Sequence, residues 1–422
     1  MLKIIYDATI ISCNFYKDDN RSGIFFVGLN ILEELRKRTD VELFLYVDPE
    51  KSADAIRLQT EYYPNENWFQ DFSKNKFLSG IYSKFQLFYN AILCHQMLRK
   101  PVALMLFFLQ FLLKRNVKTD VERIKDADAF LSPVFKVPDI IRKYSSIRPY
   151  VFLHDAIPVK FPQFFPYGKS FVVKIMESSR QGDRFFAVSQ NTKKDFEEFF
   201  PEVVREENTM VVPLAVNERF DIVKDENTIK KIKSKYRIPE NKKYVFSLCT
   251  VEPRKNLIRA VRAFLNFVEK NKIEDLVWVM GGAVWVSFAK ELAHQGVNWN
   301  KNQILHVGYV DDEDLPALYS NAEWFVYTSQ YEGFGIPPLE AMRCGCPVIT
   351  SNNSSLPEVV GDAGIKIDWD CDEQHVAAYE KYYYNKELRN EKISSGLEFA
   401  KKFSWEKTVS QIVACVSENA IK

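Results

Sequence analysis

Short apolar runs rich in β-branched and aromatic residues recur along the chain, and longer amphipathic stretches separate them. This alternation is typical of parallel sheets covered by helices, so it predicts an α/β fold with two doubly wound sheets. The strands predicted in the first half are residues 3–6, 41–46, 129–131, 150–153, 184–188 and 210–212. Those predicted in the second half are residues 244–248, 276–280, 304–307, 324–327, 348–350 and 365–367.

The same pattern divides the chain near residue 212. There a predicted strand runs into Pro213, a lysine-rich stretch follows, and a new strand, YVFSL, begins at Tyr244. We therefore expect a first domain over 1–212, a second over 213–395 and a final segment over 396–422. Apolar residues recur at helical spacing in that segment, which predicts a terminal helix. The length of 422 residues suits two domains.

Composition and charge restrict the class of protein. The chain is 46% hydrophobic and 27% charged, which indicates a soluble globular protein. It carries 57 Lys and Arg against 56 Asp and Glu. This balance gives no overall attraction to nucleic acid, so any anion site must be local.

The N-terminus and the cysteines bear on location. The run MLKIIYDATIIS is too short for a signal peptide and is interrupted too early by Asp7. Seven cysteines are scattered without a paired CxxC spacing. We therefore expect reduced thiols in the cytoplasm and no zinc set. We interpret CGC at 344–346 as small buried residues after a helix rather than as a metal or redox pair.

Residues 77–115 depart from the regular α/β pattern, because they are unusually aromatic and contain about twelve consecutive largely apolar residues. The run is too short to span a bilayer, and we expect Pro101 to separate it from the preceding helix. One interpretation is a buried core helix or the wall of an acceptor pocket, with His95 structural. The other is an interfacial helix whose basic ends contact lipid phosphates. The basic residues at the ends are Arg99, Lys100, Lys114 and Arg115.

The stretch YEGFGIPPLEAM (331–342) follows a predicted strand and carries the candidate ligand loop. A dinucleotide loop belongs after the first strand of a domain and needs a third glycine, whereas here Pro338 stands at that position. Prolines suit the first turn of a helix, where a missing amide hydrogen costs nothing. The backbone amides of Gly333, Phe334, Gly335 and Ile336 would then be free to meet hydroxyls or an anion.

Two glutamates, Glu332 and Glu340, bracket the start of this predicted helix. A carboxylate accepts hydrogen bonds from two vicinal hydroxyls at once, which suits a sugar or a ribose. Glu340 alone would also be favoured by the helix dipole, but that effect does not account for the pair with its glycine loop. The pair therefore indicates an elongated, sugar-containing ligand.

Three other clusters follow predicted strands or precede helices. Arg254 and Lys255, in VEPRKNL, come before a helix expected near residue 256, and cations there oppose the helix dipole, so they indicate a diphosphate site. His154 and Asp155 directly follow strand 150–153, where ligand residues of α/β folds gather, although a single histidine can be structural. In RSGIFF, Gly23 precedes an amphipathic helix and would let the backbone approach a ligand.

Together these motifs resemble family 4 of the retaining glycosyltransferases, which has an E-x7-E signature and two Rossmann-like domains in the GT-B arrangement. The similarity covers nearly the whole chain, is strongest over 244–370 and is weak between about 48 and 125. It implies two domains facing a central cleft, with the C-terminal helix packing back on the first domain. The matching motifs, which lie in that family's order, are RSGI, LHD, VEPRKNL, GYVDDEDLPALYSNAE, YEGFGIPPLEAMRCGCPVITSNNSSLPEVVGDAG and FSWEKT.

The resemblance implies roles for the residues that match. Glu332 would contact the hydroxyls of the donor sugar, helped by the amides of residues 333–336, and Glu340 would hold the nucleotide ribose. Arg254 and Lys255 would bind the donor diphosphate and stabilise the leaving charge. His154 would lie beside the sugar.

Three further donor-binding positions follow from the same resemblance. Gly23 would leave room for the acceptor and the phosphates, and Val310 would lie near the base. Thr250, together with Cys249, stands where members often have a glycine and sometimes an arginine. Arg254 and Lys255 are therefore the cations expected to serve the phosphates there.

The implied activity is hexosyl transfer with retention from a nucleotide sugar to a glycan or lipid-linked saccharide, in surface polysaccharide synthesis. GDP-mannose is the favoured donor because VEPRKN is similar to mannosyl-transferring members, and UDP and dTDP sugars stay open. Alternatives on the same architecture are a nucleotide-sugar epimerase, a phosphorylase and a catalytically silent sugar-nucleotide-binding protein. A phosphorylase would need a cofactor-binding lysine motif that we do not find.

No metal or other cofactor is expected. The sequences DAD (126–128) and DWDCD (368–372) resemble a metal-binding DxD motif only superficially. The first precedes a strand, and the second follows one far from the phosphate cluster. The expected partners are the nucleotide sugar, the acceptor and, in the interfacial interpretation of residues 77–115, the inner membrane surface.

Overall fold

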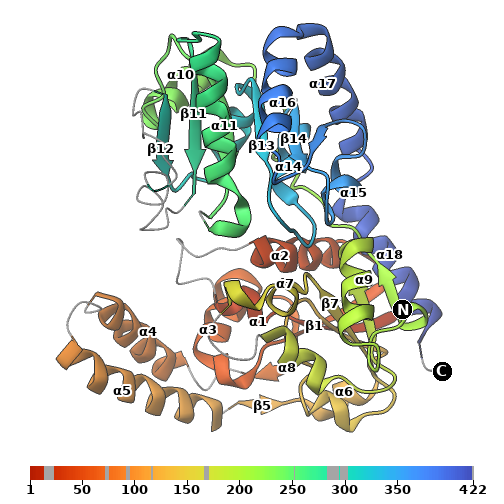
Figure 1. Ribbon diagram of the computed structural model, residues 1–422. Coiled ribbons are helices and arrows are strands. Elements are labelled where there is room, and N and C mark those ends of the chain that lie inside the picture. The colour runs from red at the N-terminus through yellow and green to blue at the C-terminus, as the bar shows by residue number, and fades with distance from the viewer. Residues whose placement is uncertain are drawn as a thin grey trace.

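The computed structural model describes residues 1–13, 23–71, 76–91, 96–115, 117–165, 171–250, 252–282, 294 and 303–420. Its strands form two parallel sheets, each covered by helices and each in its own half of the molecule (Figure 1). The predicted α/β class is confirmed. All twelve predicted strands are present within one or two residues at each end, because they are buried runs of apolar residues.

The first sheet has the order β3-β2-β1-β6-β7-β8-β9, so the chain starts in the middle and winds outward in both directions. Two-residue strands, β3 here and the separate antiparallel pair β4 and β5, are too short to leave a sequence pattern and were not predicted. The strands are β1 (Leu2–Asp7), β2 (Val41–Tyr46), β3 (Asn67–Trp68), β4 (Gln70–Asp71), β5 (Lys118–Thr119), β6 (Ala129–Ser132), β7 (Arg148–Leu153), β8 (Arg184–Ala187) and β9 (Thr209–Val211).

The second sheet repeats the same winding with the order β12-β11-β10-β13-β14-β15. Adjacent strands are parallel throughout, and the register between β11 and β12 shifts at Met280 and Gly281. The strands are β10 (Lys243–Leu248), β11 (Leu276–Gly281), β12 (Ile304–Gly308), β13 (Trp324–Tyr327), β14 (Val348–Ser351) and β15 (Ile365–Ile367).

Helices cover both sheets and connect their strands. Those of the first half are α1 (Thr9–Cys13), α2 (Gly23–Arg36), α3 (Ser52–Arg57), α4 (Lys76–Ala91), α5 (Gln96–Arg115), α6 (Val121–Lys125), α7 (Ile157–Lys160), α8 (Phe171–Ser178) and α9 (Gln190–Phe199). Those of the second half are α10 (Glu226–Lys235), α11 (Leu257–Lys270), α13 (Leu315–Ser320), α14 (Ile336–Arg343), α15 (Leu356–Val360), α16 (Asp372–Tyr384), α17 (Lys386–Ala400) and α18 (Trp405–Glu418). None of the helices in these described parts is long and apolar enough to cross a membrane.

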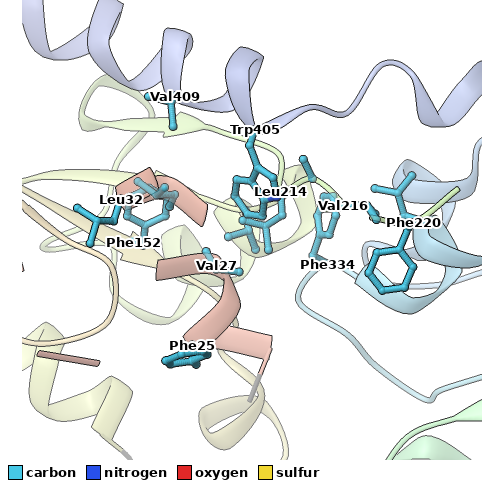
Figure 2. Packing of buried hydrophobic residues seen from close by; sticks show 14 of the residues in the cluster. Phe25, Val27, Leu32, Phe152, Leu214, Val216, Phe220, Phe334, Trp405 and Val409 are labelled. Atoms are coloured by element: carbon cyan, nitrogen blue, oxygen red, sulfur yellow. The ribbon is translucent and has the colours of Figure 1, made fainter. Parts of the chain in front are cut away.

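The terminal helix α18 returns to the first half of the molecule and packs along α2 (Figure 1). Its apolar side buries Val409 and Ile412, and the Thr408 hydroxyl donates to the carbonyl of Pro213 at 2.8 Å. The expected return of this helix is confirmed. Figure 2 shows that Trp405 of α18 lies beside Leu214 of the connecting segment in one buried cluster. The hydrophobic core therefore runs from one half of the molecule to the other.

Helices α4 and α5 correct one prediction. We expected Pro101 to separate two helices, but it lies inside α5, whereas α4 already ends at Ala91. A proline this close to the start of a 20-residue helix removes one hydrogen bond, and the helix continues because Leu106, Leu109 and Leu113 are buried on one of its sides. His95 lies outside the described residues.

Candidate functional site

A cleft of about 630 Å³ lies between the two halves, at the carboxyl ends of the strands, where α/β folds place ligands. Loops after β7, β10, β13 and the start of α2 contribute to its walls. Eleven of the twelve predicted site residues line it: Gly23, His154, Thr250, Arg254, Lys255, Val310, Glu332, Gly333, Phe334, Gly335 and Ile336. The twelfth, Glu340, lines an adjoining pocket of about 200 Å³.

The centre of the cleft is a buried ion cluster. Glu332 follows β13, whereas Arg254 and Lys255 lie in a single 3-10 turn between β10 and α11. The Lys255 ammonium contacts the Glu332 carboxylate at 2.5 Å and donates to the Tyr327 hydroxyl at 2.9 Å. Arg254 approaches Glu332 to 3.1 Å and also pairs with Glu252 at 2.5 Å.

Mutual attraction fixes the charges in this cluster. Burial alone would raise the pKa of Glu332, but Lys255 and Arg254 outweigh it and hold the pKa below its ordinary value. Burial alone would lower the pKa of Lys255, but Glu332 raises it above its ordinary value. At neutral pH the Glu332 side chain is therefore a carboxylate held between two cations. The side chains predicted to hold the sugar and the diphosphate contact each other directly.

The glycine loop before α14 serves two purposes. Gly335 has a φ of +109°, a backbone conformation that favours glycine, and it is the residue that precedes the helix. Within the described residues, the amides of Gly333 to Ile336 are bonded to no acceptor; their predicted contact with a ligand stays a prediction. The two prolines follow within the first turn of the helix, as expected.

Gly333 lacks a side chain for a reason other than the predicted approach of a ligand. A methyl group at this position would lie 2.0 Å from the carbonyl oxygen of His154 and 2.8 Å from the Asp155 side chain. The carbonyl of Gly333 accepts hydrogen bonds from the hydroxyls of Ser189 at 2.7 Å and Thr192 at 2.9 Å. The absence of a side chain therefore lets this loop contact the first half of the molecule closely.

Glu340 lies on α14, one turn into the helix, and its carboxylate accepts from the Tyr319 hydroxyl at 3.0 Å. Burial raises the pKa of Glu340 to about 7, against the lowering effect of that hydrogen bond. The adjoining pocket also contains Arg219 and Asp312, which approach each other to 3.5 Å. Because the two pockets share Gly23, Asp312 and Ile336 among their lining residues, one long ligand could reach both Glu332 and Glu340.

His154 lies at the end of β7 and is hydrogen-bonded through Nε2 to the carbonyl of Pro133 at 2.6 Å. A carbonyl only accepts, so Nε2 carries the proton and Nδ1 is left as an acceptor. Burial lowers the pKa of His154, so the ring is neutral at pH 7. This side chain can receive a hydrogen bond from a sugar hydroxyl, but it does not act as a general acid.

Several cleft residues were not identified from the sequence. Asp155 was noted beside His154 without a role, and it accepts from the backbone amide of Ile157 at 3.0 Å while it faces the ion cluster. Burial raises its pKa. Tyr327 and Asp312 also line the cleft. Tyr327 is the last residue of a buried strand and gives no sequence signal apart from this position, where ligand residues gather.

The remaining predicted residues, Thr250, Val310 and Gly23, line the cleft at positions that indicate no particular ligand group. Thr250 is an exposed lining residue, and Val310 is buried and packs close to Gly281. A methyl group added at Gly23 would meet nothing within 4 Å in the part of the chain that the structure describes. Among the described residues that line the cleft, Arg254 and Lys255 are the lysine and arginine residues. Residues 21, 22 and 251 of the predicted motifs lie outside the described residues.

Polar contacts join the two halves next to the cleft. The Glu358 carboxylate of α15 accepts from the backbone amides of Gln190 and Asn191, both at 2.8 Å, at the start of α9. The Tyr331 hydroxyl contacts the Asp195 carboxylate at 2.8 Å. These partners lie more than 130 residues apart in the sequence, so the sequence pattern could not pair them.

Residues of the two acidic motifs and of the CGC sequence make contacts within the fold. Asp128 accepts from the backbone amide of Lys3 at 2.8 Å, and Asp372 pairs with Arg259 at 2.5 Å. Cys344 and Cys346 are buried in the core after α14, as predicted. Burial raises the pKa of each thiol, so both stay protonated.

The second half of the chain is similar in sequence to known glycosyltransferases. Residues 228–398, which run from α10 into α17, match a family model described as glycosyl transferases group 1. The O-antigen chain mannosyltransferase B of Escherichia coli is 39% identical over 171 residues, which is 40% of this chain and 44% of that protein. The serotype-specific mannosyltransferase WbdA of Escherichia coli is 29% identical over 214 residues, which is 49% of this chain and 26% of that protein. Each match spans less than half the length of the relative.

Solved structures extend the similarity to the whole chain. The structure of Anabaena HepE in complex with UDP and glucose has a TM-score of 0.64 at 16% identity, covering 99% of this chain and 100% of that one. WaaG, described as a glycosyltransferase involved in lipopolysaccharide biosynthesis, has a TM-score of 0.61 at 15% identity, covering 98% and 99%. At these identities the likeness bears on the fold alone, and it confirms the expected GT-B arrangement of two Rossmann-like domains.

Proposed function

We propose that this protein is a retaining, metal-independent glycosyltransferase that transfers mannose from GDP-mannose to a glycan or lipid-linked saccharide in surface polysaccharide synthesis. The observation that carries the proposal is the buried cluster of Glu332, Arg254 and Lys255 in the cleft between the domains. The similarity of the second domain to mannosyltransferases supports mannose as the transferred sugar.

The two cations suit the departure of a nucleoside diphosphate. When the bond between the anomeric carbon and the phosphate oxygen breaks, negative charge grows on the diphosphate and positive charge grows on the sugar. Arg254 and Lys255 are charged and stand side by side in the cleft, so they can stabilise the charge that grows on the leaving group. The free amides before α14 add donors in the same region. The acceptor hydroxyl then forms the new bond on the same face, and the leaving phosphate takes its proton.

The ion cluster also provides a way to couple donor binding to catalysis. A bound diphosphate competes for Lys255 and Arg254, which frees the Glu332 carboxylate to accept from hydroxyls of the sugar. His154 offers its Nδ1 acceptor from the first domain. The sugar would thus be held from both domains, whereas the nucleotide would be held by the second.

Glu340 and Asp312 suit the nucleoside. Glu340 would accept from the two ribose hydroxyls, as the sequence predicts. Asp312 lines the cleft and the adjoining pocket. A carboxylate there can accept from the ring N–H and the exocyclic amine of guanine together, whereas uracil offers a single N–H donor. This difference favours a guanosine nucleotide.

A panel of nucleotide sugars tests the donor. We expect GDP-mannose to raise the melting temperature more than UDP or dTDP sugars, and we expect nucleotide release when lipid-linked or soluble acceptors are added. An α-linked product from the α-linked donor, identified by NMR, would establish retention. Conversion of GDP-mannose into another sugar nucleotide would indicate an epimerase. Donor binding without turnover on any acceptor extract would indicate a silent binding protein.

The location follows from the proposed substrates. Sugar nucleotides are made in the cytoplasm, so we propose that the protein works there or at the inner face of the membrane. Fractionation of cells tests this, with the protein expected in the cytosol or released from membranes by high salt.

A further inference from the structure

The helices α4 and α5 form a pair that extends from the first domain, away from the second (Figure 1). Helix α5 buries one side against the domain through Leu106, Leu109 and Leu113. Its opposite side is also apolar and faces solvent. The exposed fractions of these side chains are 70% for Leu104, 74% for Phe107, 54% for Phe108 and 49% for Phe111.

The spacing of these residues defines a continuous stripe. Positions 104, 107, 108 and 111 are three or four residues apart, so they share one face of the helix. Helix α4 has a similar exposed face with Phe77, Leu87 and Phe88, whose spacing of 10 and 11 residues returns to the same side after three turns. A helix that is apolar on all sides is normally buried, so this exposed face requires a partner.

The charge of the pair indicates what that partner is. Residues 76–115 contain six lysine and arginine residues and no aspartate or glutamate, whereas the rest of the chain has 51 basic against 56 acidic residues. Lys84 is exposed on the same face of α4, and Lys100 and Arg115 are exposed at the two ends of the apolar stripe on α5. Large apolar side chains flanked by cations complement a layer that is apolar inside and anionic at its surface.

We propose that α4 and α5 dock this protein on an anionic lipid bilayer, with the exposed face of the pair in the interface and its cations on lipid phosphates. The exposed side chains enter the boundary between headgroups and acyl chains, and the buried side of α5 keeps the helices attached to the domain. The proposal does not depend on the transfer reaction, because none of the described residues of the pair lines the cleft. It decides between the two interpretations of residues 77–115, since the pair is neither a fully buried core nor a wall of the described pockets.

Flotation with lipid vesicles tests the proposal. We expect the full chain to float with vesicles made of equal parts phosphatidylglycerol and phosphatidylcholine, and to float weakly with phosphatidylcholine alone. High salt should reduce binding, because it screens the cations. The variant Leu104→Ser/Phe107→Ser/Phe108→Ser/Phe111→Ser should remain with the free protein. The variant Lys84→Gln/Lys100→Gln/Arg115→Gln should lose binding on the order of 100-fold on the anionic vesicles.

A matched control separates this surface from general stickiness. Tyr384 is 62% exposed at the end of α16 in the second domain, and Tyr384→Ser should float like the unchanged protein. Circular dichroism and thermal unfolding verify that each variant is folded, and the charge variant changes surface positions only. The proposal is overturned if the unchanged protein fails to bind anionic vesicles, or if both variants bind them as well as it does. It is also overturned if sedimentation shows a dimer that the serine variant abolishes while vesicle binding is absent.

Discussion

Glu340 illustrates how burial sets the behaviour of a single residue in this cleft. Its pKa of about 7 lies above the ordinary value of 4.5, whereas the pKa of Glu332 lies below that value because two cations contact it. The two glutamates of one loop and helix therefore differ in charge near neutral pH. The unfolded chain ionises Glu340 near pH 4.5, whereas the folded protein ionises it near pH 7. The free energy of unfolding therefore falls as the pH rises from about 4.5 to about 7.

This difference predicts that donor affinity depends on pH. The ionised carboxylate accepts from two ribose hydroxyls, whereas the protonated form presents one donor, so binding should tighten as pH rises through about 7. Titration calorimetry with GDP-mannose should show an affinity gain of up to about tenfold between pH 6 and pH 8. The diphosphate of this donor does not titrate in that interval.

The variant Glu340→Gln provides the control for this prediction. It keeps the shape of the side chain and cannot ionise, so its weaker affinity should change little over the same range. An equal pH dependence in the variant and the unchanged protein would show that another group is responsible.

At the residue level the sequence indicates candidate residues but not the contacts between them. Glu332, Arg254 and Lys255 are recognisable from their positions after predicted strands. Their contact depends on β10 and β13 being neighbours in the second sheet, which no local pattern reveals. The same holds for His154, whose bond to Pro133 decides its protonated nitrogen.

The glycine loop shows how an element is fixed by a contact between domains. Replacing Gly333 with alanine should push the loop away from His154, since the added methyl group would lie 2.0 Å from a carbonyl oxygen that cannot move far. We expect Gly333→Ala to lower turnover by at least about tenfold, because a displacement of about 1 Å at reacting groups is costly. Activity and far-UV circular dichroism measure the two effects.

Gly80 is the matched control for this change. It lies in α4, and a methyl group there would meet nothing within 4 Å. Gly80→Ala should retain full turnover in solution. Normal activity of Gly333→Ala would mean that the loop adjusts and that the contact with His154 is not needed.

Glu358 connects the second domain to the start of α9 in the first. Its carboxylate accepts from the first two backbone amides of α9, whereas the hydroxyl of the N-cap residue Ser189 accepts from the amide of Thr192. Removing it in Glu358→Ala should cost about 1–2 kcal/mol of unfolding free energy and weaken the contact between domains. Urea unfolding measures the first effect, and small-angle scattering should show a larger radius of gyration.

Glu269→Ala removes the same charge from an exposed position on α11. Stability and radius of gyration should stay unchanged in this control. If Glu358→Ala matches it in both measurements, the contact seen here contributes nothing in solution.

Elements were predicted best where burial alone determines them. The strand over 41–46 is one example. It has the predicted bounds because all of its apolar residues are buried. Pro101 was expected to end a helix because proline disfavours the helix interior, but tertiary packing of α5 overrode that preference. Two-residue strands such as β3 depend on pairing with a neighbour and have no periodicity of their own.

The molecule as a whole is joined by a core that passes between the domains. The connecting segment contributes Leu214 and Val216, the glycine loop contributes Phe334, and α18 contributes Trp405 (Figure 2). Such a core predicts that the two domains unfold together, because neither keeps its apolar surface covered without the other.

A substitution on α18 tests this joint stability. Ile412 is fully buried, so Ile412→Ala should cost about 2–5 kcal/mol. Differential scanning calorimetry should show a single transition at a lower temperature. The exposed neighbour in Gln411→Ala should leave that transition in place. Two separate transitions, with one of them unaffected by Ile412→Ala, would contradict a shared core.

The sequence indicated two domains and the return of the last helix, but the details of their contact depend on pairs such as Glu358 with residues of α9 that lie far apart in the chain. Residues 77–115 remained open between two interpretations, because an apolar helix has the same pattern whether it is buried by protein or by lipid. The exposed fractions of Leu104 and Phe107 distinguish them.

The most direct test of the proposed function is the rate of GDP release from GDP-mannose in the presence of acceptor, measured for the unchanged protein, Glu332→Gln and Lys255→Ala. Both variants should keep the fold and lose most turnover, since one removes the acceptor for sugar hydroxyls and the other removes a cation from the leaving diphosphate. Removal of one stabilising charge of this kind typically costs about 100-fold to 1,000-fold in rate. Near-normal rates in both folded variants would contradict the assignment of this cluster as the catalytic centre.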